Sequence, residues 1–514
     1  MSERFLEIGY GDFDQHYTTG RQIRSLPSYE CNDETGELQI FDPIWGECQI
    51  GEWEGDGIFS ELYRHPVFQR LAAIEQLTLP KQYATMPGSV EFTRWEHVWG
   101  SVVFVRKMIE DAEAKGRTFD PREKLTLQLR TLLSDAGHTA FSHLGDWLKQ
   151  GFGGSEDSHD QTLEQFLEDT GVSTILRRHN IQPEEVIFPD TQDWVECDSP
   201  DLCVDRVDYG VREIDRWVLP GATQYWKNAF TLDEQNRLIM KNERLAKMFG
   251  AGFGLLATEH WGHPVHRMQL QFFGELIKSA IMNGGTFLRD EPMMHPLDAL
   301  YTIDSDLMMA TRQVGPLNNN LHAVMLDVAR AQRRIFSWGR EHEISRFMEL
   351  IHVEDLLPDF PHPLSTDSSW QMRYSGAVPQ NIEVLPVTST HEIEDFGQRP
   401  YCFDMHLTPL KPRGVDPLFY DDDGNVQRLS ETDSHFRELL SRHRALQSQA
   451  YAARLYLAPN AVQDLRESMT SVQEEWEKAI QLPRTPDSAR ALYENMKFIG
   501  GMALGHSPNS IRLV

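Results

Sequence analysis

The sequence predicts a mainly α-helical protein with a smaller α+β region at its C-terminal end. From about residue 59 to residue 339, apolar side chains recur every three or four positions, as on one face of a helix. Beyond about residue 370, short segments alternate apolar and polar residues, which is typical of strands. The chain has 514 residues, 40% of them hydrophobic, which is enough for a sizeable core divided over two or three domains.

The N-terminal segment precedes the helical pattern. Residues 1–36 are polar, and we expect a loop or an extended arm there. ELQIFDPIWGECQIG (37–51) alternates and contains turn residues, which predicts a short hairpin. We therefore assign residues 1–54 to an N-terminal arm and hairpin.

The helical pattern begins near Phe59. FSELYRHPVFQRLAAIEQL (59–77) places its apolar residues on one helical face, interrupted at Pro66, and HVWGSVVFVRKMIEDAEAKG (97–116) forms a second amphipathic helix. EKLTLQLRTLLSDAGHTAFSHLGDWLKQ (123–150) predicts two further helices with a break near Ala136 and Gly137. The pattern continues through LHAVMLDVARAQRRIFSWG, so we expect a helical core over 55–350.

The remaining 351–514 form the predicted α+β C-terminal region. QNIEVLPVTST (380–390) and PYCFDMHLTPLKP (400–412) alternate like strands. VDPLFYDDDGNVQRL (415–429) predicts a hairpin with an Asp-Gly turn, and SHFRELLSRHRALQSQAYAARLYL (434–457) predicts a helix.

Composition narrows the class of protein. The five cysteines form no CxxC pair, so we expect neither a disulfide framework nor a zinc knuckle. This use of cysteine predicts a reducing, cytoplasmic location. The first residues lack a basic stretch followed by an apolar run, and no segment approaches roughly 18 apolar residues, so we expect no signal peptide and no membrane span. The net charge of −29 opposes broad nucleic-acid binding. A small anion could bind only where arginines converge.

Four segments carry more acids, imidazoles and arginines than a helical core needs. They are FTRWEHVWG (92–100), SDAGHTAFSH (134–143), EDSHDQ (156–161) and CVDRVDYGVRE (203–213). Spacings of three and four residues place the polar groups of a segment on one helical face, and apolar neighbours indicate that these faces point inward. Buried acids and histidines need partners or a metal ion, so the four segments together predict a metal or phosphate site.

Each of these residues also has an ordinary interpretation. A single histidine or arginine on a helix is usually a satisfied core residue or a surface charge, and only convergence of the four segments indicates chemistry. HWGHPVH (260–266) offers three further histidines, for which a second metal site, a structural role and a phosphate contact all stay open.

In order and spacing, these segments resemble the HD-superfamily deoxynucleoside triphosphate triphosphohydrolases, which include bacterial dGTPases and the vertebrate SAM- and HD-domain restriction factor. FDPIWG (41–46) is similar to the family's NDPIHG, and HPVFQRLAAIEQL (65–77) to its TPQFQRLRxIKQL. RGVDPLFYDDDGNVQRLSE (413–431) resembles the family's C-terminal segment. The resemblance implies that 55–350 is an HD-type helical catalytic core.

The resemblance implies a divalent metal cofactor. Its ligands would be His97, Asp135 and Asp205, and Ser134 stands where the family has a fourth ligand, a histidine. A neutral hydroxyl is a poor ligand beside imidazole, and the remaining oxygen-rich set favours Mg or Mn, with Fe or Zn as alternatives. Asp135 would also count among the catalytic residues.

The resemblance assigns the remaining site residues to the substrate. The phosphates would face His138 and His143, with His159 as proton donor and with Arg94 and Arg206 as phosphate ligands. The sugar side would be formed by Gln76, Leu77 and Tyr209, and Glu213 stands where the family's substrate pocket has an acid. Because Tyr209 would close the 2′ side of the sugar, deoxynucleotides are the expected substrates.

The implied function is hydrolysis of a dNTP to a deoxynucleoside and inorganic triphosphate, in control of the dNTP pool or in antiphage defence. The alternative is a nucleotide-binding sensor or regulatory subunit that has lost the metal, and a third class is HD phosphohydrolase chemistry on a modified or signalling nucleotide. A homo-oligomer and a nucleotide effector are also implied. Phe41, Arg64 and Ala72 depart from the family's activating guanine site, so an effector of that design is not expected.

Overall fold

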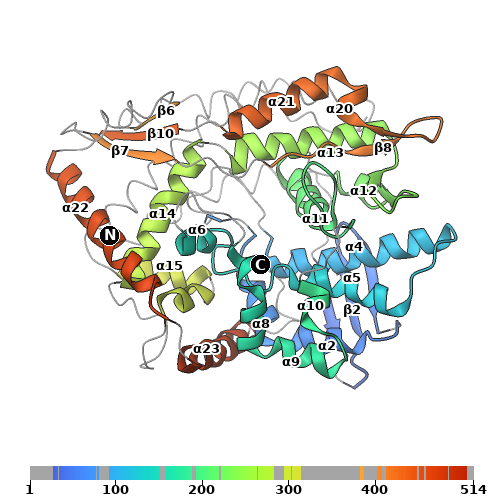
Figure 1. Ribbon diagram of the computed structural model, residues 1–514, viewed down its shortest axis with the longest axis horizontal. Coiled ribbons are helices and arrows are strands. Elements are labelled where there is room, and N and C mark those ends of the chain that lie inside the picture. Colours follow the sequence, from blue (N-terminus) through green and yellow to red (C-terminus); the bar gives the residue numbers. More distant parts are fainter. Residues whose placement is uncertain are drawn as a thin grey trace, which may run out of the picture.

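The computed structural model describes most of the chain between residues 27 and 505 (Figure 1). The described ranges are 27–313, 382–386, 402–407 and 413–505, with gaps inside them at 33, 52, 77, 80–91, 151–157, 188–192, 219–221, 263, 283–294, 303, 449–450, 457–458 and 484–485. The predicted helix at 321–339 and most of the predicted N-terminal arm lie outside these ranges. The described part is mainly α-helical with three small sheets, as predicted.

The N-terminal sheet contains the predicted hairpin. β2 (Leu38–Asp42) and β3 (Gly46–Ile50) pair antiparallel with Asp42 opposite Gly46, which confirms it. A third strand, β1 (Ser28–Cys31), pairs with β2, so the prediction of a loop or arm there was wrong. β1 is only four residues long, and its alternation of half-buried Tyr29 and Cys31 with exposed Ser28 and Glu30 is too short to distinguish a strand from a loop in the sequence.

Pro66 separates the first two helices. α2 (Gly57–Arg64) ends before Pro66, and α3 (Pro66–Arg70) begins with that proline at its first turn, where no amide hydrogen is needed. α3 continues into the short 3₁₀ helix η1 (Leu71–Ala73). The predicted interruption at Pro66 is therefore confirmed.

Two neighbouring helices each begin after a residue whose side chain caps the helix. α4 (Arg94–Ala114) begins after Thr93, whose hydroxyl accepts a hydrogen bond from the Glu96 amide at 3.3 Å. α5 (Pro121–Leu133) begins after Asp120, which accepts from the Glu123 amide at 2.8 Å. Such caps satisfy amide groups that have no partner within the helix. The two helices lie side by side (Figure 1).

The other helices extend over the rest of the described ranges. They are α6 (Leu144–Gln150), α7 (Ser158–Gln161), α8 (Leu163–Thr170), α9 (Val172–Arg178), α10 (Pro183–Ile187), α11 (Val204–Glu213), η2 (Ile214–Val218), α12 (Thr223–Trp226), α13 (Glu243–Leu256), η3 (Ala257–Trp261), α14 (Pro264–Met282), η4 (Pro296–Tyr301), α15 (Asp304–Gln313), α20 (Leu429–Thr432), α21 (Ser434–Ser448), α22 (Pro459–Ile480) and α23 (Pro486–Gly505). Of the helices in the described ranges, none combines the length and the apolar character that crossing a bilayer requires.

A four-stranded sheet joins distant parts of the chain. Its order is β4 (Phe230–Leu232), β5 (Leu238–Met240), β8 (Leu418–Tyr420) and β9 (Val426–Arg428). The β8–β9 hairpin was predicted, whereas β4 and β5 lie in a segment predicted to be helical. Because β5 pairs with β8, this sheet crosses the predicted boundary at residue 350, and the domain division remains a prediction.

The C-terminal sheet lies at the opposite end of the molecule from β2 (Figure 1). Its order is β6 (Ile382–Pro386), β10 (Tyr451–Tyr456) and β7 (Cys402–Leu407), all antiparallel. β6 and β7 confirm the predicted strands, and α21 confirms the first part of the helix predicted over 434–457. For β10 that prediction was wrong. The YAARLY segment is compatible with helix, but as the central strand it pairs on both edges, and this pairing overrides local propensity.

Two buried histidines predict how stability depends on pH. Burial lowers the pKa of His65, which caps α3, and that of His443 in α21 to about 4. Since the unfolded side chains have a pKa near 6.5, the unfolded state binds protons first as the pH falls. We expect each histidine to reduce the free energy of unfolding by on the order of 3 kcal/mol between about pH 6.5 and 4.

Urea unfolding at pH 7, 5.5 and 4.5 of the wild type and of His65→Gln checks this expectation. The variant loses some stability at pH 7, and its disadvantage should shrink as the pH falls, because the wild type alone must then keep His65 unprotonated. A stability difference that does not change over this pH range would contradict the assignment.

Candidate active site

One cavity of about 480 Å³ brings the four segments together. Among its lining residues are the following predicted site residues: Gln76, Arg94, His97, Ser134, Asp135, His138, His143, His159, Asp205, Arg206, Tyr209 and Glu213. Leu77, also predicted, lies outside the described residues. The convergence that the sequence could only suggest is therefore present.

The loop between α5 and α6 positions His138 and His143. The loop begins where α5 ends at Leu133, close to the break predicted near Ala136. Within the loop, Phe141 and Ser142 adopt positive φ angles of 57° and 53°. The Phe141 amide donates to Asp304 at 2.7 Å. The Ser142 hydroxyl donates to the Glu75 carbonyl at 2.7 Å. These bonds to distant segments hold the strained turn in place.

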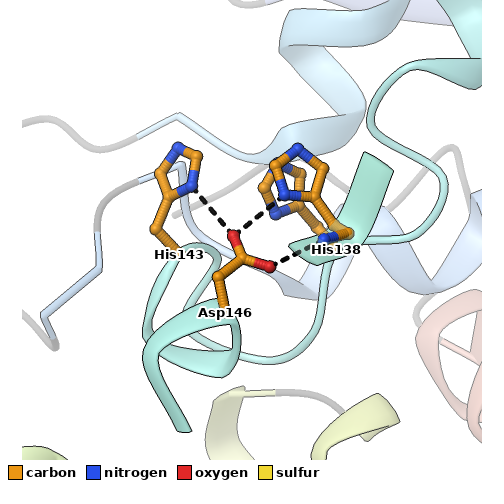
Figure 2. Close-up of side chains that lie close together, drawn as sticks. His138, His143 and Asp146 are labelled. Atoms are coloured by element: carbon orange, nitrogen blue, oxygen red, sulfur yellow. Dashed lines mark hydrogen bonds and ion pairs between the residues drawn. The ribbon is translucent and has the colours of Figure 1, made fainter. Parts of the chain in front are cut away.

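Three histidines and one aspartate form a compact cluster (Figure 2). One carboxylate oxygen of Asp146 lies 3.1 Å from Nδ1 of His143 and 2.9 Å from Nδ1 of His159. The rings of His138 and His159 stack with their centroids 3.8 Å apart. Asp146 therefore fixes two imidazole rings, and the third packs against them.

The environment gives these histidines different proton affinities. Burial lowers the pKa of His138 well below its usual value, and the positive charge of Arg94 lowers it further. Burial also acts to lower the pKa of His159, but the neighbouring charge of Asp146 outweighs it and raises this pKa. The two stacked imidazoles therefore differ in proton affinity, with His159 holding a proton more strongly than His138. Groups with such separated pKa values are suited to act as acid and base.

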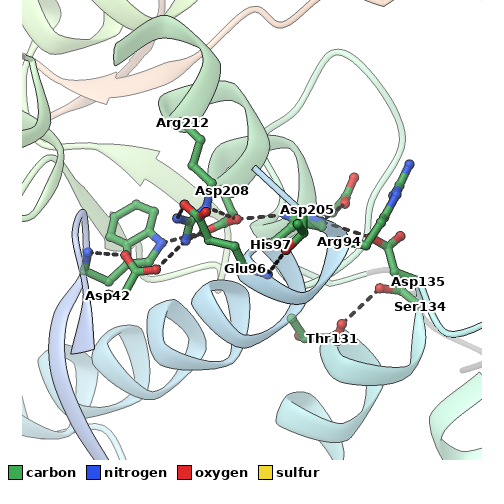
Figure 3. A network of polar contacts seen from close by, with 12 residues as sticks. Asp42, Arg94, Glu96, His97, Thr131, Ser134, Asp135, Asp205, Asp208 and Arg212 are labelled. Carbon is green, nitrogen blue, oxygen red and sulfur yellow. Dashed lines mark hydrogen bonds and ion pairs between the residues drawn. The ribbon is translucent and has the colours of Figure 1, made fainter. Parts of the chain in front are cut away.

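A second group, of His97, Asp135 and Asp205, has the chemistry of a metal site (Figure 3). Nε2 of His97 lies 3.1 Å from an Asp205 oxygen and 3.5 Å from an Asp135 oxygen. The three ligand atoms lie within 4.8 Å of one another, and His97 and Asp135 are buried. One imidazole and two carboxylates fit a divalent ion, and three protein ligands are sufficient for a catalytic metal.

A buried carboxylate orients the histidine of this group. Nδ1 of His97 lies 2.7 Å from Asp208, which also accepts a hydrogen bond from the Trp45 indole at 2.6 Å. The other ring nitrogen, Nε2, is thereby directed at Asp205 and Asp135. Metal-binding histidines commonly have such a carboxylate partner, which sets the tautomer and raises the basicity of the ligand.

Arg212 connects three elements behind the metal group (Figure 3). Its guanidinium contacts Asp208 in α11 at 2.8 Å, Glu96 in α4 at 2.9 Å and Asp42 in β2 at 2.6 Å. It passes directly over Gly100 of α4, where any Cβ atom would collide with it. Gly100 thus provides the space that this arginine occupies.

Ser134 lies at the rim of the metal group without taking part in it. Its hydroxyl donates to the Thr131 carbonyl at 3.0 Å, as a residue at the C-terminal end of α5 can. The hydroxyl is therefore bonded to the helix backbone and is not directed at His97 or Asp135 (Figure 3).

Arg94 lies between the two groups. Its Nη1 donates to Asp135 at 2.7 Å and its Nε to Ser142 at 3.0 Å. Its Nη2 is buried and has no hydrogen-bond partner among the described residues, and the same is true of Nδ1 of His138. Unsatisfied buried polar groups are rare in proteins, and inside a cavity they indicate a polar ligand.

The other predicted substrate residues lie along the same cavity. Burial raises the pKa of Glu213 to about 8, and this carboxylate accepts from the Trp261 indole at 2.9 Å. Tyr209 is buried and packs edge-on against His97. Arg206 lines the cavity, but its guanidinium donates to the backbone carbonyls of Cys197 and Asp201, which turns it toward that loop.

Several residues of the site were not predicted. Asp146 follows His143 by three residues on one helical turn, a spacing that could have indicated it. Arg413, with Nη2 3.4 Å from Nε2 of His143, comes from 270 residues further along the chain, and no local signal places it there. Of the HWGHPVH histidines, His266 lines the cavity, whereas His263 and the side chain of His260 lie outside the described part.

Comparison with known proteins gives distant relatives. No family model matches the chain. The metal-dependent phosphohydrolase cns2 of Cordyceps militaris is 26% identical over 261 residues, which are 48% of this chain and 67% of that protein. The deoxynucleoside triphosphate triphosphohydrolase SAMHD1 of Bos taurus is 23% identical over 211 residues, 39% of this chain and 32% of that protein.

Among solved structures, a phosphohydrolase from Bacteroides thetaiotaomicron covers 81% of this chain and 99% of its own, with 15% identity and a TM-score of 0.44. The cavity contains His and Asp groups that suit a metal cofactor, and the sequence relatives include a protein named for metal-dependent phosphohydrolysis. The chain is thus similar, at low identity, to proteins named for metal-dependent phosphohydrolysis and for deoxynucleoside triphosphate hydrolysis.

Proposed function

We propose that this protein hydrolyses deoxynucleoside triphosphates to a deoxynucleoside and inorganic triphosphate with a divalent metal ion. The observation that carries the proposal is the unsatisfied Nη2 of Arg94, buried beside the His97, Asp135 and Asp205 group. A guanidinium with a free edge next to a metal group is suited to a phosphate that the metal also contacts. The SAMHD1 relative supports a nucleotide as the carrier of that phosphate.

In the proposed reaction, one group of residues holds the metal ion, Arg94 contacts the phosphates and His159 donates a proton. A divalent ion at His97, Asp135 and Asp205 would polarise the α-phosphate and lower the pKa of a water molecule. Water adds to the α-phosphorus and the bond to the 5′ oxygen breaks, so the water oxygen leaves with the triphosphate. Arg94 offsets the charge on the phosphate oxygens. His159, whose proton Asp146 stabilises, supplies the proton that the 5′ oxygen needs.

For the residues that would contact the substrate, we propose the roles that the family resemblance implies. Gln76, Tyr209 and Glu213 line the cavity and would contact the sugar and base, with Tyr209 excluding a 2′-hydroxyl. His138 and His143 would face the phosphates together with Arg206. The cytoplasmic location, the homo-oligomer, the nucleotide effector and the role in dNTP-pool control or antiphage defence are predictions from the family resemblance.

Product analysis with each dNTP and its ribonucleotide, with Mn²⁺ or Mg²⁺, tests the proposal. We expect deoxynucleoside and triphosphate as products and slower turnover of ribonucleotides. Arg94→Ala should weaken dNTP binding about tenfold to a hundredfold, because a charged hydrogen-bond donor is lost. Arg177→Ala, which removes an exposed partner of Glu168, is the matched control and should change nothing. Unchanged dNTP affinity in Arg94→Ala would refute the assignment of the cavity.

A second candidate function is a nucleotide sensor without catalysis. The position of the Ser134 hydroxyl favours it, because a hydroxyl bonded to the Thr131 carbonyl leaves the metal with three protein ligands. A sensor would bind dNTPs but show no turnover of any of the four at saturating metal concentration.

A further inference from the structure

A second arginine of the cavity lies on α5, one helical turn before Ser134. The side chain of Arg130 is 9% exposed, and its Nη1 forms an ion pair with Asp193. Its Nη2 is buried and has no hydrogen-bond partner among the described residues, although the side chain lines the cavity. Arg130 therefore repeats the pattern of Arg94: one edge of the guanidinium is held by a carboxylate and the other edge is unsatisfied.

The carboxylate that holds Arg130 is itself fixed. Asp193 accepts hydrogen bonds from the amide of Val195 at 2.8 Å and from that of Glu196 at 3.4 Å. A pre-positioned partner limits the rotamers of Arg130, so its free edge remains in one place. Leaving a buried N–H without a partner is unfavourable, and a ligand on that edge would remove this cost.

The surroundings of Arg130 suit an anion. Thr131 and Ser134 also line this cavity. The Thr131 hydroxyl donates to the Leu127 carbonyl at 2.9 Å, and the Ser134 hydroxyl donates to the Thr131 carbonyl at 3.0 Å. The neighbouring cavity wall includes Val186 and Val195, both buried and apolar. Because the side chain of Arg130 is almost wholly buried, attraction between its guanidinium and an anion is stronger than at the surface.

We infer that Arg130 is a second anion-binding residue and takes a phosphate group other than the one at Arg94. The two guanidiniums are held by separate carboxylates, Asp193 and Asp135, on different segments of the chain. Two fixed and separate points of positive charge match a ligand with several phosphates, so the ligand class is a polyphosphate or a nucleoside polyphosphate. The inference deepens the proposed function, on which its nucleotide part rests.

Binding of inorganic tripolyphosphate to the full chain, measured by calorimetry with a chelator present, tests this without any turnover. We expect Arg130→Gln to weaken tripolyphosphate binding about tenfold to a hundredfold and to change orthophosphate binding much less. Arg122→Gln is the matched control on the same helix, because Arg122 is exposed and pairs with Glu185 at the surface. Unchanged tripolyphosphate affinity in Arg130→Gln would overturn the inference.

Asp193→Asn distinguishes a ligand from a structural ion pair, because it removes the charge of the pair but keeps an acceptor oxygen that can hold the guanidinium in place. Tripolyphosphate bound as tightly as by the wild type supports the inference, and a loss equal to that in Arg130→Gln overturns it. If Arg130→Gln does not fold, Arg130→Lys replaces it: a weaker affinity supports the inference, and an unchanged one overturns it. Arg130-dependent binding of tripolyphosphate without dNTP hydrolysis would refute the proposed function alone.

Discussion

Asp135→Ala should lower dNTP hydrolysis by roughly a thousandfold or more, the largest effect expected of any single substitution. Asp135 is 4% exposed and contacts three functional side chains: Arg94 at 2.7 Å, His138 at 3.3 Å and His97 at 3.5 Å. Its removal would take a ligand from the metal and at the same time release Arg94. Both changes act on the same phosphate, so they should compound.

Initial rates at saturating Mn²⁺, together with the metal content of the purified variant, measure this loss. Asp120→Ala is the control, because Asp120 caps the opposite end of the same helix, and its loss should cost about 1 kcal/mol of stability with no effect on the rate per folded molecule. Asp135→Asn, which keeps the shape but not the charge, should be almost as inactive. Wild-type rates in either Asp135 variant would show that the reaction does not use this metal group.

Ser134→His should raise metal affinity about tenfold to a hundredfold, by analogy with the affinity changes found when groups that support a metal are altered. With three protein ligands, the wild type should bind its ion weakly and need added millimolar Mn²⁺ or Mg²⁺ for activity. Ser134 lines the cavity at the end of α5, next to Asp135, so an imidazole there adds a fourth ligand. The gain in rate should appear at limiting metal concentration and disappear at saturation.

Metal titrations of activity and direct measurement of metal binding check this expectation. Ser134→Ala is the control: since the hydroxyl donates to the Thr131 carbonyl, its loss should leave metal affinity unchanged. If Ser134→Ala weakened metal binding, the serine would be a ligand after all. If Ser134→His left affinity unchanged, the position would not face the metal.

Local patterns predicted the elements that are determined locally. The helix break at Pro66 follows from a missing amide hydrogen, and the β8–β9 hairpin follows from its Asp-Gly turn, so both were visible in the sequence. β10 was not, because its strand conformation comes from pairing with β6 and β7, whose sequences lie elsewhere. β1 was missed because its alternation covers only four residues, too few to distinguish a strand from a loop.

The candidate site shows the same division. The family resemblance implied His97, Asp135 and Asp205 as a group, and the structure brings them together. The supporting pairs were not predictable: Asp193 meets Arg130 across 63 positions, and Arg413 meets His143 across 270. Such contacts depend on how helices and loops pack, which residue type and spacing do not encode.

Because Gly100 has no side chain, the Arg212 guanidinium fits against α4, and this packing bears on how the metal group can lose one ligand. His97 and Asp205 come from α4 and α11, and the separation of these helices is set by the single guanidinium of Arg212 that fits between them. The spacing of the ligands is thus a property of the backbone scaffold and does not depend on a complete set of ligands. The separation of His97 and Asp205 therefore does not depend on Ser134, and a serine in place of the expected histidine leaves these two side chains where they are.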